Sequence, residues 1–412
     1  MAPPAVLMVG SGEYTTGFVG GSASTSDKKI GVVGLTLFDL RRRGKVGALS
    51  IVGTSGHKFP AIREHLHNNI TKVYNNLDTS FNSYPANDKT DPEAYKAAID
   101  ALPAGSAITI FTPDSTHYPI AKYAIERKIH VMITKPATQL LSHHLELLTL
   151  SRQHGVFVYI EHHKRFDPAY LDAKHRAVNQ LGDFNYWYSY MSQPKSQLAT
   201  FKAWAGKDSD ISYYLNSHHV DICAWIVGSL GWHPAVVRAS ASRGIAEAEG
   251  CVEGTEDTIT LLVDWTHPDK AGKRATGIYT ASWTAPQNAG VHSQQHFHYV
   301  ASKGEVNVNQ AKRGYEVVSD PPDATAAEAG TKWINHSTCG IRRTRRGISV
   351  GRPGMGVNEG KVTVEELDRR GLPTLGNTIV TTAILEAGRR SLDGGGKAIE
   401  ILKRENDRWE LR

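Results

Sequence analysis

The stretch Ala5-Val6-Leu7-Met8-Val9-Gly10-Ser11-Gly12 determines the fold expected for the first part of this chain. Its apolar residues predict a buried strand, and the glycines after it allow a tight turn whose backbone approaches a phosphate closely. We therefore expect Gly10, Ser11 and Gly12 to contact a bound dinucleotide. The third glycine comes only at Gly17, later than in the usual dinucleotide fingerprint, so a purely structural turn remains the alternative.

Short apolar runs alternate with amphipathic stretches over the first 160 residues. The predicted strands are Ala5–Val9, Ala48–Gly53, Ala107–Thr112, Ile129–Ile133 and Val156–Ile160. The predicted helices are Val33–Arg43, Pro92–Leu102, His117–Lys128 and Ser142–His154, with a small polar loop inserted at 20–27. This alternation predicts an α/β domain over residues 1–162 with a doubly wound parallel sheet of the Rossmann type.

The pattern changes after residue 162. The predicted strands are 184–190, 258–265, 276–283, 296–301 and 305–309, and the predicted helices are 211–227 and 376–391. This density of strands predicts an α+β domain over residues 163–375 with an open mixed or antiparallel sheet. Residues 318–375 show weak periodicity and are predicted to form long loops. Residues 376–412 are a segment that can pack back on the first domain.

Composition is that of a soluble globular protein, with 40% hydrophobic and 21% charged residues. No apolar run is long enough to span a bilayer, and Met1–Pro4 lacks the basic start of a signal peptide. Three widely spaced cysteines, an odd number, fit a reducing compartment. We therefore expect a cytoplasmic protein without a membrane partner.

The net charge of +6 favours small anionic ligands over nucleic acid, because the Lys and Arg residues are mostly scattered. The exception is the cluster Arg342-Arg343-Thr344-Arg345-Arg346. A solvated loop is the simplest interpretation of this cluster, and a targeting or phosphate-binding patch is the alternative. We expect no nucleic acid partner.

The end of the second predicted strand indicates which dinucleotide binds. NAD-binding sequences carry an Asp or Glu there for the ribose hydroxyl, whereas this chain has Thr54, Ser55 and Lys58 and no carboxylate. Hydroxyls and an ammonium suit a 2′-phosphate, so we expect NADPH/NADP+ rather than NADH. The alternative is a polar turn with a solvated lysine.

Thr112 and Pro113 follow the third predicted strand and are expected to line the cofactor site. His117 either faces the same crevice or lies on the surface of a helix.

A lysine follows the fourth predicted strand, in Ile133-Thr134-Lys135-Pro136. Open α/β sheets bind ligands at the carboxyl ends of their strands, and the proline holds the preceding residue in an extended conformation. Lys135 is therefore a candidate for proton chemistry beside the nucleotide, with Pro136 lining the cofactor.

A second cluster lies on the predicted helix 211–227. Tyr214, His218 and Asp221 are spaced i, i+4 and i+7 and share one face of a regular helix. A carboxylate that orients an imidazole next to a phenol is a plausible proton relay. A hydrogen-bonded core cluster without catalytic function is the alternative.

Together these motifs resemble the family of glucose-fructose oxidoreductase, inositol dehydrogenase and the rhizopine-catabolism proteins (Gfo/Idh/MocA). The resemblance also includes Glu161–Tyr170, similar to the segment that enters the second domain, and Leu385–Ser391, similar to the closing helix. It implies that Lys135 hydrogen-bonds the reacting oxygen and relays its proton, and that His218 is the catalytic or substrate-orienting histidine. Tyr214 could supply the proton instead, as a third catalytic residue. The family usually has Glu where this chain has Thr134, and often Asp where it has Tyr214.

Within the family, the closest resemblance is to fungal D-galacturonate reductases. It implies NADPH-dependent reduction of the aldehyde of D-galacturonate to L-galactonate. The substrate residues are then Lys135, Lys164, Arg165, Tyr214, His218 and Asp221, with the cations facing the uronate carboxylate. The alternative for Arg165 is that it simply bridges the two domains. The family also implies a homodimer or higher homo-oligomer that buries the open face of the second sheet.

Three other functions stay open. An aldose, cyclitol or dihydrodiol dehydrogenase of the same family would use the same residues. A dinucleotide-binding transcriptional regulator would not catalyse the hydride transfer. Such regulators tend to lose the catalytic lysine, which this chain retains as Lys135. A metal enzyme would use the paired histidines, but neighbouring histidines cannot both face one site on a regular element, and we expect no metal.

Overall fold

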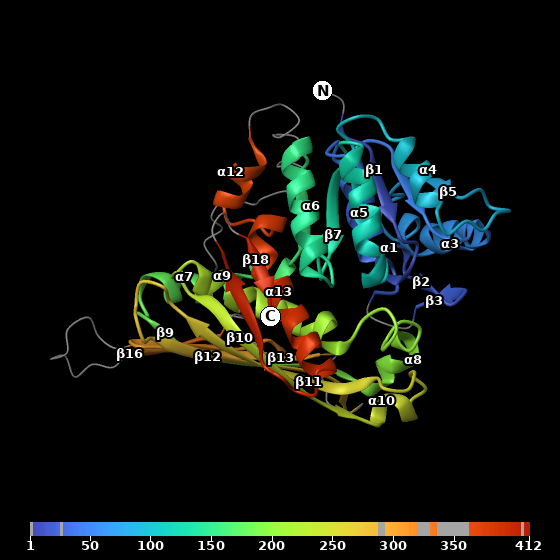
Figure 1. Cartoon of the computed structure of the whole chain (residues 1–412). Helices are drawn as coiled ribbons and strands as arrows, with labels where there is room; N and C mark the ends of the chain where they lie inside the picture. The colour runs from blue at the N-terminus through green and yellow to red at the C-terminus, as the bar shows by residue number, and fades with distance from the viewer. Residues whose placement is uncertain are drawn as a thin grey trace. The chain divides into compact units, whose positions relative to one another are not determined.

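A computed structural model describes residues 3–24, 28–286, 293–312, 314–319, 330–335, 362–404 and 408–412. The chain divides into two compact units (Figure 1). The first unit contains Met1–Ala137, His143–Glu161 and Arg345–Gly376, and the second contains Thr138–Ser142, His162–Thr344 and Asn377–Arg412.

The first unit is built on a six-stranded parallel sheet in the order β5-β4-β1-β6-β7-β8. Its strands are β1 (Val6–Val9), β4 (Leu49–Val52), β5 (Asn82–Tyr84), β6 (Ala107–Ile110), β7 (His130–Thr134) and β8 (Val158–Glu161). The strand order reverses between β1 and β6, which is where sheets of this kind bind ligands. The predicted doubly wound α/β sheet is confirmed.

Helices cover this sheet because its strands are buried on both faces. They are α1 (Glu13–Thr16), α2 (Val32–Arg42), α3 (Phe59–Leu66), α4 (Ala94–Asp100), α5 (His117–Glu126), α6 (Leu141–His154) and α12 (Val364–Arg369). Met8 and Ile51 pack against Phe38, Phe59 and Ile62 in one core cluster. A second cluster joins β8 to α12 through Phe157, Tyr159 and Leu367.

The described part of the predicted loop at 20–27 belongs to a longer insertion in the turn after β1, and residues 25–27 lie outside the described residues. The short helix α1 comes first, followed by the hairpin β2 (Phe18–Val19) and β3 (Ser22–Ala23), before α2 begins. Gly17 has a φ of +72°, and a Cβ there would lie 2.2 Å from the carbonyl oxygen of Lys29. A Cβ at Gly34 would lie 2.4 Å from the carbonyl oxygen of Thr15. Glycines thus let α1 pack closely on the start of α2.

The second unit holds a ten-stranded sheet in the order β16-β15-β14-β13-β9-β12-β11-β10-β17-β18. Its strands are β9 (Phe184–Pro194), β10 (His233–Arg243), β11 (Glu256–Thr266), β12 (Arg274–Ala285), β13 (Gln294–Ala301), β14 (Gly304–Asn309), β15 (Gly314–Ser319), β16 (Gly330–Asn335), β17 (Ile399–Lys403) and β18 (Trp409–Leu411). β9 and β12 are parallel, whereas β10 and β11 are antiparallel. The mixed sheet of the second unit is confirmed.

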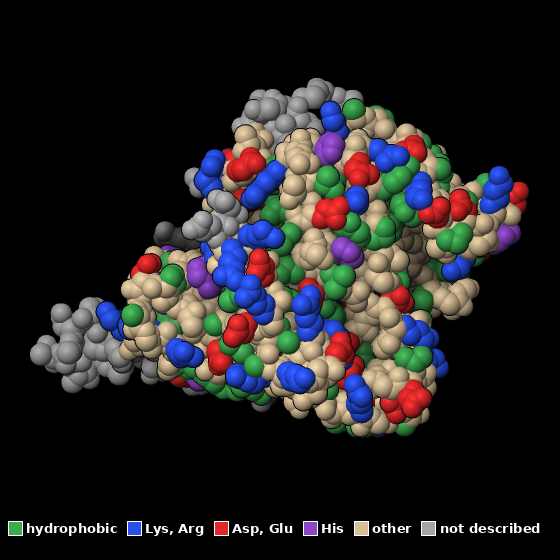
Figure 2. Space-filling model, viewed as in Figure 1, with side chains coloured by type: hydrophobic (Ala, Val, Ile, Leu, Met, Phe, Trp, Pro, Cys, Tyr) green, Lys and Arg blue, Asp and Glu red, His purple; other side chains and the backbone are tan. Residues whose placement is uncertain are grey.

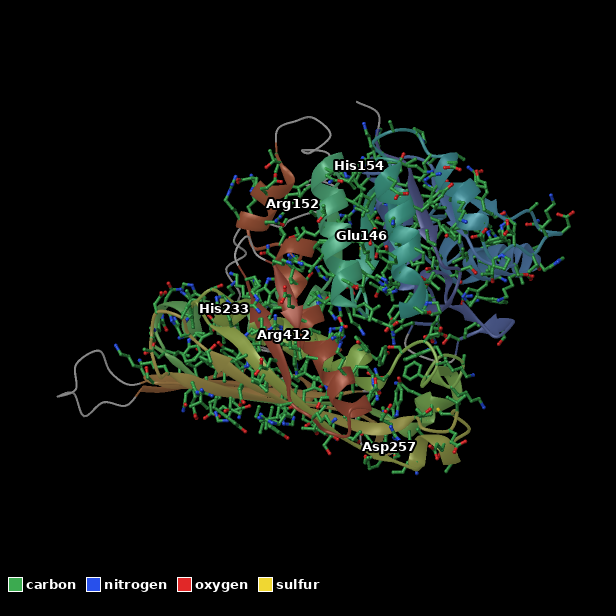
Figure 3. The ribbon with its side chains drawn as sticks, in the orientation of Figure 1. Glu146, Arg152, His154, His233, Asp257 and Arg412 are labelled. Atoms are coloured by element: carbon green, nitrogen blue, oxygen red, sulfur yellow. The ribbon has the colours of Figure 1, made fainter. Side chains whose placement is uncertain are left out.

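Helices lie on one face of this sheet (Figure 1). They are α7 (Pro168–Asn179), α8 (Leu198–Phe201), α9 (Ser217–Gly228), α10 (Ile245–Ala248) and α13 (Leu375–Asp393). Trp187 and Phe297 stack within the sheet and contact His219 of α9. Side chains on the other face project away from the helices (Figure 3), and alternate residues of β11 are only half-buried.

The segment predicted as long loops contains the end of β15, strand β16 and helix α12. Because this segment is polar, its weak hydrophobic periodicity did not predict these elements. The Arg342–Arg346 cluster and Cys339 lie outside the described residues. Cys223 is buried and Cys251 is half-buried.

None of the described helices has the length and hydropathy needed to cross a membrane. Lys and Arg side chains are interspersed with Asp and Glu on the face shown in Figure 2.

Candidate active site

The glycine turn lies at the point where the strand order of the first sheet reverses. Gly10 has a φ of +105°, and a Cβ there would lie 2.2 Å from the carbonyl oxygen of Phe111, just after β6. A Cβ at Gly12 would meet no atom within 4 Å. Because Gly12 is also exposed, the backbone of the turn is open to a ligand. These residues fit the pyrophosphate of a dinucleotide.

The end of β4 lies next to this turn, since a Cβ at Gly53 would approach the Ser11 hydroxyl to 2.7 Å. Thr54 and Lys58 are exposed, and Ser55 is half-buried. The short 3₁₀ turn Gly56–Lys58 leads into α3. The edge of the site therefore offers hydroxyls and an ammonium, and no carboxylate follows β4 directly.

His117 does not face the crevice as one interpretation of the sequence expected. Its side chain is 0% exposed, with Nδ1 2.9 Å from the carbonyl oxygen of Pro136 and Nε2 3.0 Å from that of Thr112. His117 joins the turns that follow β6 and β7. It thereby fixes these two turns but is itself buried away from the crevice. Thr112 is half-buried and Pro113 is exposed.

Lys135 lies at the carboxyl end of β7 and is half-buried. Burial lowers the pKa of Lys135 to about 8, although the negative charges of Asp114 and Glu161 oppose this change. The positive charge of Lys28 lowers the same pKa further. Lys135 therefore gives up its proton more easily than an ordinary lysine.

Glu161 was missed by the sequence argument. It pairs in register with Thr134 across β7 and β8, so the neighbouring strand supplies a carboxylate where Thr134 lacks one. The signal was available, because Glu161 directly follows the predicted strand Val156–Ile160. Like Lys135, it stands at the carboxyl end of a parallel strand.

The predicted helix 211–227 is not regular. Ser212–Asn216 form a π-helical turn, and α9 begins only at Ser217. A π turn has i→i+5 hydrogen bonds, which breaks the i, i+4, i+7 spacing that would put three side chains on one face. The ring of Tyr214 lies 5.1 Å from that of Phe201, whereas the ring of His218 lies 5.2 Å from that of His163. Tyr214 and His218 thus have different surroundings.

Arg165 and Asp221 bind each other, which differs from their expected roles as substrate contacts. The guanidinium donates two hydrogen bonds of 2.7 and 2.6 Å to the carboxylate, and the residues are 2% and 1% exposed. Burial raises the pKa of Asp221, but Arg165, His162 and Thr381 outweigh it and lower the pKa overall. This buried, bidentate pair joins the 3₁₀ turn His163–Phe166 to α9, and the two guanidinium nitrogens that form it are not free to hold a ligand.

Lys164 is also engaged within the second unit. It is 4% exposed, and its ammonium donates to Gln295 and, at 2.9 Å, to Gln310. The amide oxygens of β13 and of the 3₁₀ turn after β14 therefore hold this cation.

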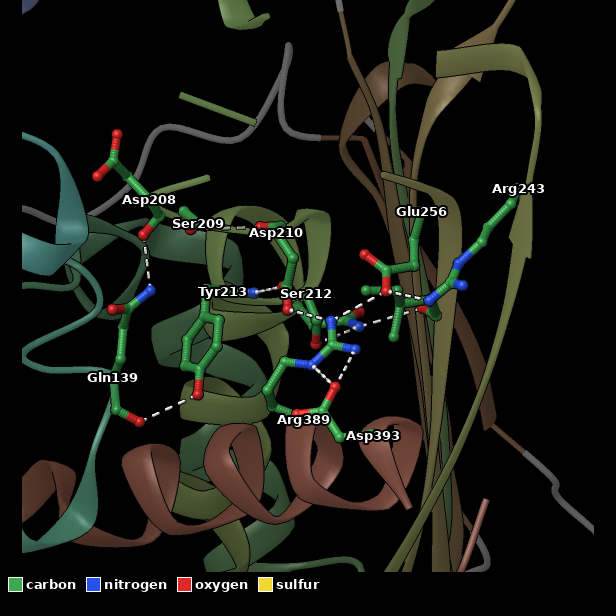
Figure 4. Close-up of polar contacts among 12 residues, drawn as sticks. Gln139, Asp208, Ser209, Asp210, Ser212, Tyr213, Arg243, Glu256, Arg389 and Asp393 are labelled. Carbon is green, nitrogen blue, oxygen red and sulfur yellow. Dashed lines mark hydrogen bonds and ion pairs between the residues drawn. The ribbon is translucent and has the colours of Figure 1, made fainter. Parts of the chain in front are cut away.

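A further polar network, which the sequence did not reveal, fixes the π turn (Figure 4). The Asp210 carboxylate accepts a 2.9 Å hydrogen bond from the backbone N–H of Tyr213 and forms a 3.3 Å ion pair with Arg389. Arg389 also pairs with Glu256 at 3.0 Å. Burial raises the pKa of Asp210 to about 6, even though Tyr213 and Arg389 lower it.

Gln139 binds the same turn. Its side chain donates to the carbonyl oxygen of Asp208 at 2.7 Å, and its own carbonyl oxygen accepts from the Tyr213 hydroxyl at 3.0 Å. The chain thus runs from Lys135 directly into a segment held by the residues around Tyr214. Among the described residues, no group of three or more His, Cys, Asp and Glu side chains is placed to hold a metal ion.

Residues 6–162 match the model of an oxidoreductase family with an NAD-binding Rossmann fold, the Gfo/Idh/MocA family. The match covers well under half of the chain, and these residues are similar to that family. An uncharacterised oxidoreductase of Escherichia coli (strain K12) is 33% identical over 123 residues, which are 29% of this chain and 36% of that protein. The scyllo-inositol 2-dehydrogenase (NAD(+)) of Bacillus subtilis (strain 168) is 27% identical over 143 residues, 34% of this chain and 40% of that enzyme. The chain thus matches well under half the length of these relatives.

Solved structures show the same fold over nearly the whole chain. An inositol dehydrogenase homolog from Azotobacter vinelandii, in complex with NADH and myo-inositol, superposes with a TM-score of 0.66 at 14% identity. The match covers 97% of each chain. Both units of the protein therefore have the fold of this structure.

Proposed function

We propose that the protein is an NAD(P)-dependent oxidoreductase that acts on the alcohol or carbonyl group of a sugar or cyclitol. The observation that carries this proposal is Lys135, half-buried at the carboxyl end of β7, in the same sheet as the glycine turn. The names of the relatives support it, because the Bacillus subtilis enzyme is an inositol dehydrogenase and the Azotobacter vinelandii homolog was solved with NADH and myo-inositol.

Gly10, Ser11 and Gly12 would hold the pyrophosphate, while Thr112, Pro113 and Pro136 would line the cofactor. The bound dinucleotide would supply or accept the hydride. The Lys135 ammonium would hydrogen-bond the substrate oxygen and give it a proton as negative charge develops. With a pKa of about 8, Lys135 is mainly protonated at neutral pH and still able to release the proton.

Tyr214 and His218 are proposed as the second source of hydrogen bonds to the substrate. The π turn holds Tyr214, and the first turn of α9 holds His218. Gln139 is bound to the π turn through the Tyr213 hydroxyl, and it follows Lys135 by four positions in the sequence. We assign Gln139 a positioning role.

The more specific proposal is NADPH-dependent reduction of a sugar acid, most simply D-galacturonate to L-galactonate. Thr54, Ser55 and Lys58 support NADPH, because they place hydroxyls and an ammonium at the position where NAD-binding folds carry a carboxylate. The sugar acid rests on the resemblance to galacturonate reductases. It also requires a cation for the carboxylate, and Arg165 is already paired with Asp221.

An absorbance assay tests both the general proposal, an oxidoreductase, and the specific one, a reductase of a sugar acid. The purified protein is incubated with NADPH or NADH and with D-galacturonate, D-glucuronate or D-galactose, and with NADP+ or NAD+ and myo-inositol. We expect consumption of NADPH with D-galacturonate. Turnover of myo-inositol alone would retain the oxidoreductase and reject the sugar acid. No turnover with any pair, together with measurable dinucleotide binding, would favour the transcriptional regulator.

We also propose that the protein is a cytoplasmic homo-oligomer that buries the face of the second sheet without helices. Light scattering coupled to size exclusion measures the mass. A monomer at micromolar concentration would contradict this proposal.

A further inference from the structure

Two cations of the second unit lie against one aromatic ring, that of Trp225 on α9. The ammonium of Lys174 on α7 lies 4.0 Å from the centroid of this ring. The guanidinium carbon of Arg165, in the 3₁₀ turn His163–Phe166, lies 5.5 Å from the same centroid. The indole ring attracts both cations, but it carries only a hydrogen-bond donor and no acceptor.

One nitrogen of Arg165 stays available after the guanidinium has bound Asp221. Nε and Nη2 donate to the carboxylate, and Nη2 also donates to the carbonyl oxygen of Asn377 at 3.0 Å. Nη1 is buried and finds no hydrogen-bond acceptor within the described part of the chain, and the residue is only 2% exposed. A buried donor without an acceptor costs free energy, so its presence calls for an explanation.

The indole N–H of Trp225 is a second donor of this kind. Its nitrogen is shielded from solvent, and none of the described residues accepts its hydrogen. Lys174 adds a third donor, because its ammonium forms neither a hydrogen bond nor an ion pair with the described residues. Lys174 is half-buried, so its side chain connects the two buried donors to the solvent.

The charges around this ring are not balanced. The carboxylate of Asp221 faces both Lys174 and Arg165, so two cations share one anion. His162, whose Nε2 lies 3.5 Å from the Asp221 carboxylate, can add only positive charge. Burial lowers the pKa of Lys174 to about 7, and Arg165 lowers it further, whereas Asp221 raises it. The cluster therefore lacks one negative charge.

We propose that Lys174, the Nη1 atom of Arg165 and the indole N–H of Trp225 bind the carboxylate of a small organic acid. A carboxylate only accepts hydrogen bonds, which matches a set of groups that only donate them, and its single negative charge balances the cluster. This site involves none of the residues proposed for hydride or proton transfer, and the pair with Asp221 stays intact. Of the guanidinium, only the nitrogen that Asp221 leaves unbound contacts the ligand.

The site is tested by titrating the ¹⁵N-labelled full chain with acetate, the smallest suitable probe. The chain has eight tryptophans, and the signal that Trp225→Phe removes from the NMR spectrum identifies the indole N–H of Trp225. We expect acetate at millimolar concentrations to shift this signal. Acetamide has the same shape without the charge and should leave the signal where it is.

Calorimetry compares Lys174→Gln with Lys303→Gln, which removes an exposed lysine of the same unit. We expect Lys174→Gln to weaken acetate binding about 10- to 100-fold, the usual worth of a hydrogen bond to a charged group. Lys303→Gln should bind acetate as the wild type does.

Proton uptake gives a second readout. Because a bound anion favours the charged ammonium, acetate should raise the pKa of Lys174 above its value of about 7. Binding should then take up as much as about one proton near pH 8 and almost none near pH 6, as measured in buffers with different ionisation enthalpies. Lys174→Arg is charged at both pH values, so it should bind acetate without proton uptake.

Other outcomes overturn the inference. An unshifted Trp225 signal at tens of millimolar acetate, or an equal shift with acetamide, would show that the donors do not bind an anion. An equal shift with chloride would show a surface charge effect without a site for a carboxylate. Equal affinities of wild type and Lys174→Gln would exclude the lysine. Circular dichroism identifies a variant that does not fold. If Lys174→Gln does not fold, Lys174→Arg decides, and proton uptake equal to that of the wild type would reject the proposal. All these measurements follow binding without turnover, so they stand apart from the test of the proposed function.

Discussion

Charged side chains at the strand ends of the first unit are exposed or half-buried, whereas those around α9 in the second unit are buried in ion pairs. Lys58 and Lys135 follow parallel strands, and the sheet positions them through its backbone. Arg165 and Asp221 belong to elements that pack through side chains, and they serve that packing. A charged residue at the end of a parallel strand is therefore a better candidate for chemistry than one on a packed helix.

The largest expected effect is on catalysis in the first unit. Lys135→Ala should lower kcat/KM about 10²- to 10⁴-fold, because it removes the proton donor. Binding of NADPH, measured by fluorescence titration, serves as the control and should change little. In the wild-type protein the reduction rate should fall as pH rises through about 8, where the Lys135 ammonium loses its proton. Wild-type turnover by the variant would contradict the role of Lys135.

The next effect is on the stability of the second unit. Asp221→Asn leaves the Arg165 guanidinium buried without its counter-charge, which should lower the free energy of unfolding by about 3–5 kcal/mol. All eight tryptophans of the chain lie in the second unit, so tryptophan fluorescence during urea denaturation follows that unit alone. The double variant Arg165→Met/Asp221→Leu should recover part of the loss. Equal stability of wild type and Asp221→Asn would show that this pair does not hold the unit together.

The contrast between strand ends in the first unit and packed helices in the second also explains how far the sequence could predict the structure. All five strands predicted for the first unit are present, with ends shifted by at most two residues. The sixth, β5, was missed because Asn82–Tyr84 is short and polar. Lys135, the glycine turn and Lys58 could be placed because strand order and strand ends are local properties of the sequence.

The site residues of the second unit could not be placed in this way. The spacing of Tyr214, His218 and Asp221 predicts a common face only for a regular helix, and the π turn at Ser212–Asn216 breaks that spacing. Arg165 and Asp221 are 56 positions apart, so their pairing depends on how α9 packs. Asp210 and Arg389 are 179 positions apart and meet for the same reason. Long-range packing, which periodicity does not encode, determined these roles.

The smallest expected effect concerns the cofactor, at the exposed edge of the first unit. Lys58→Ala should raise the KM for NADPH roughly 10-fold and leave that for NADH unchanged, because the ammonium acts only on the 2′-phosphate and is partly screened by water. His57→Ala removes the exposed neighbouring side chain and is the matched control. Thr54→Asp should also favour NADH over NADPH. The new carboxylate repels the 2′-phosphate of NADPH and accepts a hydrogen bond from the ribose hydroxyl of NADH. Equal changes for both cofactors would show that Lys58 is merely solvated, and the preference for NADPH would lose its structural basis. The effect should also weaken as salt rises, which separates an exposed charge contact from the buried pairs of the second unit.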